Sequence, residues 1–347
     1  MESNDKKNTG DLHNHLNGSL TLEFLKKIAK KNNCLDIYEQ LVSIRGDYLQ
    51  RTSSQPETGY SSELIALIWK QFGLIHKIVQ NMDDITEGVL DVVQNSTAKY
   101  LEIRTTPKSM AGKTEDDYIN AFVDGLSQAK QTLHGKEAVG LLSLDRTVHT
   151  LENARHFIRR IIECPNKLLV GLDISGNPLG KRTLTGNQLR EVIHLALNSG
   201  IAIAIHMGEA ENEIEKQDTD IILSVLEEWQ SSRFTQGANP LHGKVRLGHC
   251  IFLTDAQKEK IVSLGIPIEV CPSCHSKLNW HLEKLPHPVT TIYKDLSDPV
   301  VVGTDDEIIF GASAKTEFNS LLKFFSNTKQ LDKKQLKEHQ ANFRFSL

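Results

Sequence analysis

The chain has 347 residues, of which 39% are hydrophobic and 24% charged, as in an ordinary globular protein with a large core. Its formal net charge of −4 gives no electrostatic reason to expect a nucleic acid or an anionic membrane as partner. Residues Met1–Lys7 are polar, no stretch reaches the ~20 apolar residues of a membrane span, and the five cysteines are too scattered for a disulfide framework. We therefore expect a monomeric cytoplasmic protein whose partner is a small molecule.

Apolar, β-branched runs alternate with longer amphipathic segments along the chain. Continuous hydrophobicity in these runs is typical of parallel strands covered on both faces. The segments between them, such as Thr114–Leu133 and Leu184–Asn198, carry apolar residues at helical spacing. The repeats predict a (β/α)8 TIM barrel that forms one domain over residues 1–347. The predicted strands are Gly10–His13, Lys99–Thr105, Val139–Asp145, Leu168–Ser175, Ile201–Met207, Val245–His249, Ile266–Cys271 and Val300–Asp305.

A doubly wound sheet is the alternative fold. It is disfavoured because no glycine-rich phosphate fingerprint follows the first strand. Asn17-Gly18-Ser19 stands there instead and indicates a turn into a helix.

One long insertion breaks the repeat, at residues Glu23–Val79 between the first two strands. It contains the polar stretch Thr52–Ser62 and is too long for a single crossover helix. We expect extra helices over the barrel mouth, where a lid would lie. After Phe318 the chain is lysine-rich at helical spacing, which indicates a solvated helix face.

Two histidines, His13 and His15, close the first predicted strand. Side chains two residues apart in a strand point to the same face, with Cα atoms roughly 6–7 Å apart. Both imidazoles could then bind one cation, although a pair of exposed turn histidines has the same spacing.

Further polar residues close or follow the other predicted strands, at the edge where barrel enzymes carry their active sites. These residues are Asp145, Gly176, His206 with Glu209 three residues later, His249, and Asp305 with Asp306. Three imidazoles and one carboxylate suit Zn²⁺, which activates water when one position stays open. Glu209 could then donate a proton, and His249 could orient the water or accept its proton. Asp306 could bind substrate, or cap a helix after the last strand.

The segment Cys271–His275 also spells the C-x-x-C-H pattern of haem attachment. A covalent haem, a redox pair and a zinc pair each need a context that the chain lacks. We interpret it as a loop at a strand end.

The segments DLHNHLNGSL, HMGE, RLGHC and TDDEIIF resemble the adenosine deaminase family of metal-dependent hydrolases, from Asp11 to Phe310. The resemblance implies one zinc ion per chain, bound by His13, His15, His206 and Asp305. It implies that Glu209 protonates the purine at N1 and that His249 orients and deprotonates the water. Asp306 would bind N7 and the backbone at Gly176 would face N3, with hydrolytic loss of the amine at C6.

Within the family, LEIRTTPK, LLSLDR and GLDISGNP resemble the branch that acts on N6-methyl-AMP. Asn17 replaces an aspartate that would repel a 5′-phosphate, and Lys108 could bind that phosphate. The implied reaction converts N6-methyl-AMP to IMP and methylamine, in purine nucleotide metabolism. The substrate-binding residues implied by the resemblance are His15, Asn17, His76, Thr105, Thr106, Pro107, Lys108, Asp145, Gly176 and Asp306.

Three alternatives remain open. Ser109 stands where the branch has arginine, and CPSCH and DEIIF also depart from it, which favours an adenosine deaminase that makes inosine and ammonia. The second alternative is a barrel that binds a nucleoside without catalysis, but such a protein would have no physical need to retain all the metal ligands and catalytic residues. A hydrolase of other amides or esters would share the metal but not the purine preference.

Overall fold

The structure is a computed structural model of the chain, and it describes residues 10–54, 62–233, 239–278, 287–292, 299–325 and 331–346. The polar start Met1–Lys7 and residues 55–61 of the predicted polar stretch lie outside the described residues. Within the described part, no helix is long and apolar enough to cross a membrane.

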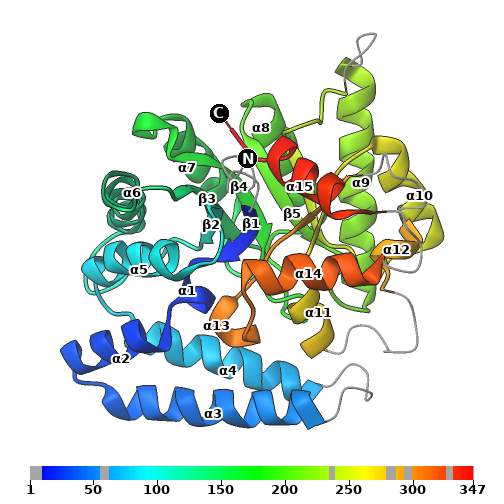
Figure 1. Cartoon of the computed structure of the whole chain (residues 1–347). Coiled ribbons are helices and arrows are strands. Elements are labelled where there is room, and N and C mark those ends of the chain that lie inside the picture. The colour runs from blue at the N-terminus through cyan, green and yellow to red at the C-terminus, as the bar shows by residue number, and fades with distance from the viewer. Residues whose placement is uncertain are drawn as a thin grey trace. The chain divides into compact units, whose positions relative to one another are not determined.

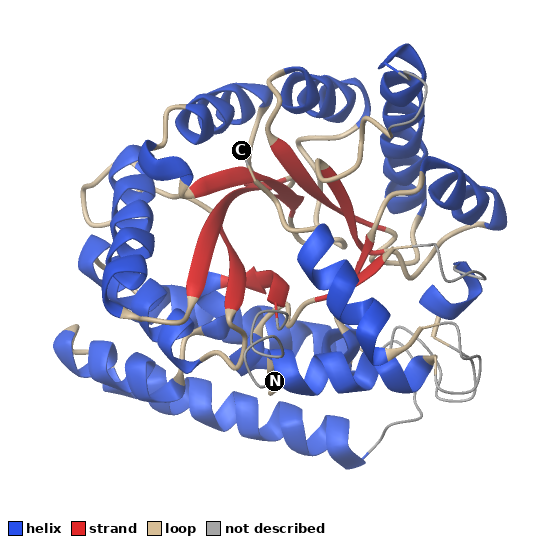
Figure 2. Cartoon of the chain, turned by 45° about the horizontal axis from the view of Figure 1, so that its top comes forward, coloured by secondary structure: helices blue, strands red, loops and turns tan. Residues whose placement is uncertain are grey.

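Eight strands form one sheet in the order β1 to β8, so each strand neighbours the next in the sequence. Every predicted strand is present, and the alternation with helices is visible in Figure 2. This is the predicted (β/α)8 fold. The strands are β1 Gly10–His15, β2 Tyr100–Thr105, β3 Glu137–Asp145, β4 Leu169–Ser175, β5 Ala202–Met207, β6 Val245–His249, β7 Ile268–Val270 and β8 Val300–Val302.

Helices separate the strands, as the hydrophobic periodicity predicts. The segments Thr114–Leu133 and Leu184–Asn198 contain helices α6 (Glu115–Thr132) and α8 (Gly186–Asn198). The other helical elements are α1 Leu16–Ser19, α2 Leu22–Lys31, α3 Leu35–Ser54, α4 Ser62–Ile78, α5 Met82–Asn95, α7 Leu151–Ile162, the 3-10 turn η2 Pro165–Lys167, α9 Glu213–Arg233, α10 Asp255–Leu264, α11 Pro272–Lys277, α12 Val289–Ile292, α13 Glu307–Phe310, α14 Ala314–Phe324 and α15 Lys333–Asn342.

The chain divides into two compact units, each built from separate stretches of sequence. The first unit comprises residues 1–140, 271–285 and 302–320. The second unit comprises residues 141–270, 286–301 and 321–347. The expected single domain stays a prediction.

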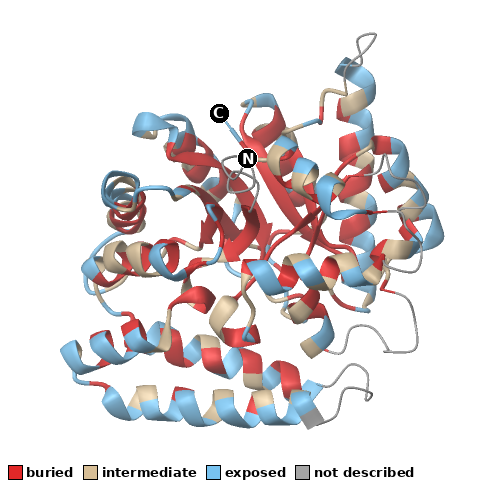
Figure 3. Cartoon of the chain, in the orientation of Figure 1, coloured by how far each residue is buried: buried red, intermediate tan, exposed pale blue. Residues whose placement is uncertain are grey.

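In the first unit, the described part of the insertion forms the extra helices that were predicted, α2, α3 and α4. Helices α3 and α4 lie side by side (Figure 1). Helix α4 buries one apolar face, whereas α3 is exposed along most of its length (Figure 3). Whether these helices act as a lid stays a prediction.

Strand β1 pairs in parallel with β2, and its register shifts between Asp11 and Asn14. On its other side, Asn14 forms a parallel bridge with Asp305, just beyond β8. The backbone N–H of His15 donates to Asp305 O at 2.7 Å, and that of Asp305 donates to His13 O at 2.8 Å. The first strand is therefore hydrogen-bonded to the segment that follows the last one.

In the second unit, β4, β5, β6 and β7 form parallel pairs in sequence order, and their residues are buried throughout. Arg246 in β6 anchors the end of the chain to this sheet. Its guanidinium pairs with Glu269 at 2.6 Å, donates to Phe343 O at 2.7 Å and lies 3.5 Å from the centroid of the Phe345 ring.

Two local predictions are wrong. Asn17-Gly18-Ser19 lies inside the one-turn helix α1 rather than in a turn before a helix. Cys271–His275 is not a loop, because α11 begins at Pro272, whose fixed φ suits a first helical position. Both of its cysteines are buried and free of disulfides.

Candidate active site

Three side chains predicted to bind a metal lie close together in the first unit, at the end of β1. His13 Nε2 and His15 Nε2 are 3.2 Å apart, and each lies 3.5 Å from Asp305 Oδ1. The strand-spacing prediction for the two histidines is confirmed, even though the register of β1 shifts between them. Three ligand atoms this close, all largely buried, are suited to share one cation.

Buried hydrogen bonds fix the backbone that carries these three residues. Thr304 donates to both Asp11 oxygens, from its backbone N–H at 3.1 Å and its hydroxyl at 2.6 Å. The Asn14 amide donates to Asp11 Oδ2 at 3.2 Å and to Thr304 Oγ1 at 3.0 Å. Burial raises the pKa of Asp11, opposed by these bonds. Asp305 itself has φ 61°, a left-handed conformation that is uncommon for non-glycine residues.

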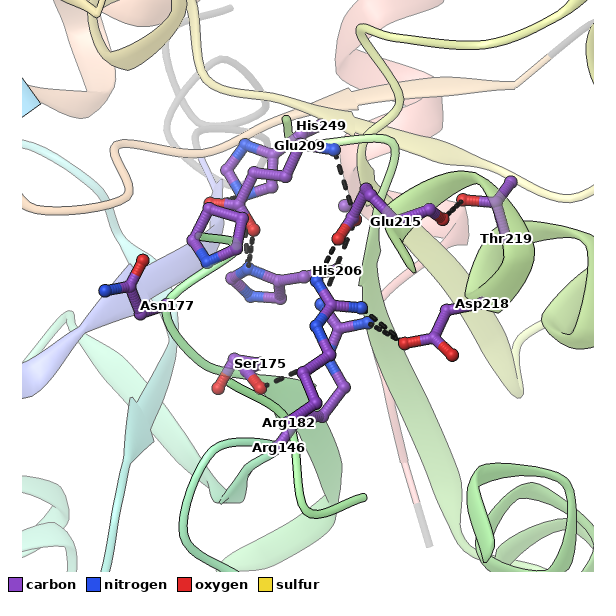
Figure 4. A network of polar contacts seen from close by, with 12 residues as sticks. Arg146, Ser175, Asn177, Arg182, His206, Glu209, Glu215, Asp218, Thr219 and His249 are labelled. Atoms are coloured by element: carbon purple, nitrogen blue, oxygen red, sulfur yellow. Dashed lines mark hydrogen bonds and ion pairs between the residues drawn. The ribbon is translucent and has the colours of Figure 1, made fainter. Parts of the chain in front are cut away.

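A second group lies in the second unit, at the ends of β5 and β6. His206, Glu209 and His249 each offer a ligand atom within 4.8 Å of the others. His206 Nδ1 lies 3.2 Å from His249 Nε2 and 3.6 Å from Glu209 Oε2 (Figure 4). The predicted neighbourhood of these three residues is therefore confirmed. His249, like Asp305, has a left-handed backbone, with φ 63°.

Asp173 in β4 orients the His206 ring. Its Oδ1 lies 3.2 Å from His206 Nε2, so the imidazole directs its Nδ1 toward Glu209 and His249. Burial alone would lower the pKa of His206, but Asp173 and Glu209 outweigh it and raise that pKa to about 10. A carboxylate on one nitrogen of a histidine is the usual way to orient a metal ligand. Sequence reasoning missed Asp173, although an acid within the apolar run of β4 was a signal.

The phosphate-binding candidates of the first unit lie close together. The amide nitrogen of Asn17 is 3.2 Å from His76 Nε2, at the C-terminal end of α4. Desolvation and the charge of Lys108 lower the pKa of His76 to about 4, although part of its side chain is exposed to solvent. Burial also lowers the pKa of Lys108. Among the described residues, Lys108 forms no ion pair, so its ammonium is available to an anionic ligand.

Residues Thr105, Thr106 and Pro107 lead from β2 to Lys108. Thr105 is buried, and its hydroxyl is 2.7 Å from that of Tyr118 in α6. Thr106 is half-buried and Pro107 buried. The stretch thus starts on a fixed strand end, which positions Lys108.

Asp145 and Gly176 lie together in the second unit, as their positions at strand ends predict. Asp145 Oδ1 accepts from the backbone N–H of Thr147 at 2.8 Å and from its hydroxyl at 2.6 Å. Gly176 has φ 122°, and a Cβ there would lie 2.4 Å from Asp145 Oδ1. Only glycine allows this approach, because the near atom belongs to a hydrogen-bonded carboxylate.

Asp306 precedes α13 in the helix N-cap position, but its side chain makes no capping bond. A Cβ on Gly18 would lie 1.8 Å from Asp306 Oδ1, so the carboxylate packs directly against the backbone of α1. The side chain of Asp306 therefore does not cap the helix after the last strand, which was the alternative to substrate binding.

A buried charge network that the sequence did not reveal lies in the second unit (Figure 4). It joins two arginines, Arg146 and Arg182, to two acids, Glu215 and Asp218, and all four are nearly inaccessible to solvent. Burial lowers the pKa of Arg146, while Glu215 raises it. No regular spacing connects these residues, which come from loops after β3 and β4 and from α9.

Each group by itself consists of residue types that can bind a zinc ion. The first unit offers two imidazoles and a carboxylate, and the second offers His206 held by Asp173. Zinc binds such nitrogen and oxygen donors, and a carboxylate in the position of Asp173 is the usual partner that orients a histidine ligand.

The chain was compared with known proteins. The sequence pattern of the adenosine deaminase family matches residues 9–343. An N6-methyl-AMP deaminase from Xenopus laevis is 27% identical over 331 residues, covering 92% of this chain and 84% of that protein. The N6-mAMP deaminase of Arabidopsis thaliana is 25% identical over 334 residues, covering 89% and 84%.

Solved structures show the same fold. The crystal structure of Arabidopsis N6-mAMP deaminase superposes with a TM-score of 0.76 at 23% identity, covering 100% of this chain and 96% of that one. Arabidopsis ADAL in complex with GMP gives 0.75 at 23% identity, covering 98% and 92%. With its family pattern matched over residues 9–343, the chain belongs to the adenosine deaminase family.

Proposed function

We propose that this protein is a zinc-dependent hydrolytic deaminase of 6-aminopurines, and that its main reaction converts N6-methyl-AMP and water to IMP and methylamine. The observation that carries the proposal is the group of His13, His15 and Asp305 at the end of β1. In a chain of the adenosine deaminase family, such a group supports a hydrolytic metal centre.

One zinc ion per chain would be bound by His13, His15, Asp305 and, from the second unit, His206. Support comes from the sheet order, since the carboxyl ends of parallel barrel strands share one edge. When bound, the ion would supply Lewis-acid activation of a water molecule at neutral pH.

The protein side chains would move the protons. His249 orients the water and takes its proton as the oxygen adds to C6 of the purine. Glu209 donates a proton to ring N1, so that C6 becomes electrophilic. Asp306 binds N7. His249 passes the proton taken from water to the amine nitrogen, and the C6–N bond breaks to release methylamine. The remaining proton of the C6 hydroxyl goes to the Glu209 carboxylate, which restores the acid as the C6 carbonyl of IMP forms. The mutual placement of His206, Glu209 and His249 supports these roles.

The preference for a nucleotide rests on Asn17, His76 and Lys108. At pH 7 a histidine with a pKa near 4 is neutral, so Lys108 supplies the positive charge of this cluster. The neutral amide of Asn17 does not repel a phosphate. The names of the relatives, N6-methyl-AMP deaminases from animals and a plant, support the same substrate.

Adenosine is the second candidate substrate, to be converted to inosine and ammonia. The observation that favours it is Ser109, an exposed residue with no charge directly after Lys108. A phosphate site with one cation is weaker than one with two.

A side-by-side rate comparison tests the proposal. Purified, zinc-loaded protein is incubated with N6-methyl-AMP, AMP and adenosine, and the purine absorbance and the released amine are followed. Faster turnover of the methylated nucleotide supports the proposal. Turnover of adenosine alone would assign the second function, and no release from any purine would refute both. The cytoplasmic location and the monomeric state stay predictions.

A further inference from the structure

The proposed proton donor, Glu209, lies in the loop between β5 and α9, which has no regular hydrogen-bonding pattern to hold it. Its backbone N–H donates to Glu215 Oε1 at 3.2 Å, and this carboxylate lies in the first turn of α9. Glu215 is only 1% exposed, so the bond is shielded from solvent. Gly208, just before it, accepts backbone hydrogen bonds from Ile251 and Phe252. Glu209 itself is therefore held by a buried acid six residues further along the chain.

Glu215 is fixed from two sides. Its own backbone N–H donates to Asn212 Oδ1 at 2.8 Å, which sets the start of the helix. Its Oε2 accepts a hydrogen bond from Arg182, and Arg146 Nη2 lies 4.0 Å from its Oε1. Its carboxylate thus has one oxygen on a guanidinium and the other toward Glu209.

The two arginines connect this carboxylate to the strand ends. Arg146 follows β3 directly, and its Nε donates to Ser175 O, the last residue of β4, at 3.4 Å. Arg182 also donates to Asp218, one turn along α9, and Arg146 Nη1 lies 3.7 Å from the same acid. The positive charges of the two arginines thus equal the negative charges of Glu215 and Asp218, and the four side chains are shown in Figure 4.

A buried charge network of this kind is weak evidence of stability, because the desolvation of its ions offsets their attraction. Residues that hold the ligands and catalytic groups of an active site, in contrast, are often buried polar groups outside the site. The network contacts the proposed catalytic loop through Glu215, whose carboxylate accepts from Glu209 N–H and whose backbone N–H donates to Asn212 Oδ1.

We infer that Glu215 is a positioning residue, which fixes the Glu209 loop so that the Glu209 carboxyl can reach the substrate. The inference rests on the proposed function. Arg182 and Arg146 hold Glu215, whereas Asp218 neutralises the arginines without touching the loop.

The test is a double-variant cycle in the zinc-loaded enzyme. Glu215→Gln is expected to lower kcat about 10- to 100-fold, with little change in KM, as for other residues that orient catalytic groups. In the Glu209→Gln background, the same change is expected to lower kcat less than about twofold, because the group it positions is gone. Equal losses in both backgrounds, or an unchanged kcat in the single variant, would overturn the inference.

Two further variants separate positioning from folding. Asp218→Asn removes an equally buried acid of the same network, and we expect it to lower the melting temperature as Glu215→Gln does, with kcat near the wild type. Glu215→Asp keeps a negative charge near the arginines, but its side chain is one methylene shorter and cannot reach Glu209 N–H, so kcat should still fall. If Asp218→Asn loses as much kcat as Glu215→Gln, or Glu215→Asp loses none, Glu215 is not the positioning residue.

Amide hydrogen exchange gives a readout independent of turnover. The Glu209 amide should exchange faster in Glu215→Gln and Glu215→Asp, and at the wild-type rate in Asp218→Asn. Unchanged protection in both Glu215 variants would overturn the inference. A wild type that deaminates no purine would instead refute the proposed function and leave this exchange result interpretable.

Discussion

Replacing Lys108 by alanine tests the nucleotide preference directly. The ammonium is half-buried, and among the described residues it forms no ion pair that would compete for it. Its neighbour His76 is neutral at pH 7, because its pKa is about 4. In the Lys108→Ala variant, a bound phosphate would therefore have no positively charged partner in the cluster of Asn17, His76 and residue 108.

The expected size follows from the strength of a charge-assisted hydrogen bond. Such a bond contributes about 1.5–3 kcal/mol, and each 1.4 kcal/mol is tenfold in affinity, so KM for N6-methyl-AMP should rise about 10- to 150-fold. KM for adenosine, which has no phosphate, should stay unchanged. Both substrates are measured by steady-state kinetics at pH 7.

Lys113→Ala is the matched control, because Lys113 is an exposed lysine five residues along the same segment. It should leave both KM values near the wild type. Equal effects of Lys108→Ala on nucleotide and nucleoside would show that Lys108 does not bind the phosphate, and the reasoning would fail.

Three other variants probe the chemistry and the packing. Glu209→Gln should keep the wild-type zinc content by elemental analysis but lower kcat by orders of magnitude, and near-normal turnover would remove Glu209 from the mechanism. Burial raises the pKa of Glu317 from 4.5 to about 7, so its stabilising contribution is full below pH 4.5 and is lost as the pH rises through 7. The melting temperature of Glu317→Gln should therefore vary less over this range than that of the wild type, and an equal variation would contradict the assignment. Phe345→Ala should lower the free energy of unfolding in urea by about 3–5 kcal/mol, because the ring is buried beneath the Arg246 guanidinium, and a loss below about 1 kcal/mol would count against that packing.

The candidate ligands could be predicted because they obey a rule that is local in sequence. His15, His206 and Asp305 each stand at or near the end of a strand, His13 lies two residues before His15, and active sites of barrel enzymes lie at these strand ends. The fold could also be predicted from local sequence, because hydrophobic periodicity separates buried strands from amphipathic helices.

The residues that orient the ligands were not predicted, for a physical reason. Arg182 and Glu215 are partners that join a loop to a helix, and no fixed spacing relates one to the other. Asp173 and His206 lie in the neighbouring strands β4 and β5, whose pairing register is not readable from the sequence. Only an isolated charge in an apolar run, as in β4, hints at a buried partner. The helix at Pro272 was not predicted, because proline is equally compatible with a turn and with the first position of a helix.

The backbone hydrogen bonds of His13 and His15 with Asp305 join residues about 290 positions apart, which has a consequence for biosynthesis. Until the ribosome has made β8 and Asp305, β1 lacks its partner on one side, and the two histidines lack their carboxylate. Contacts so distant in sequence close late and slowly. The proposed zinc ion should therefore be bound tightly only after Asp305 has been synthesised, and a nascent chain stalled before Asp305 should hold the metal weakly.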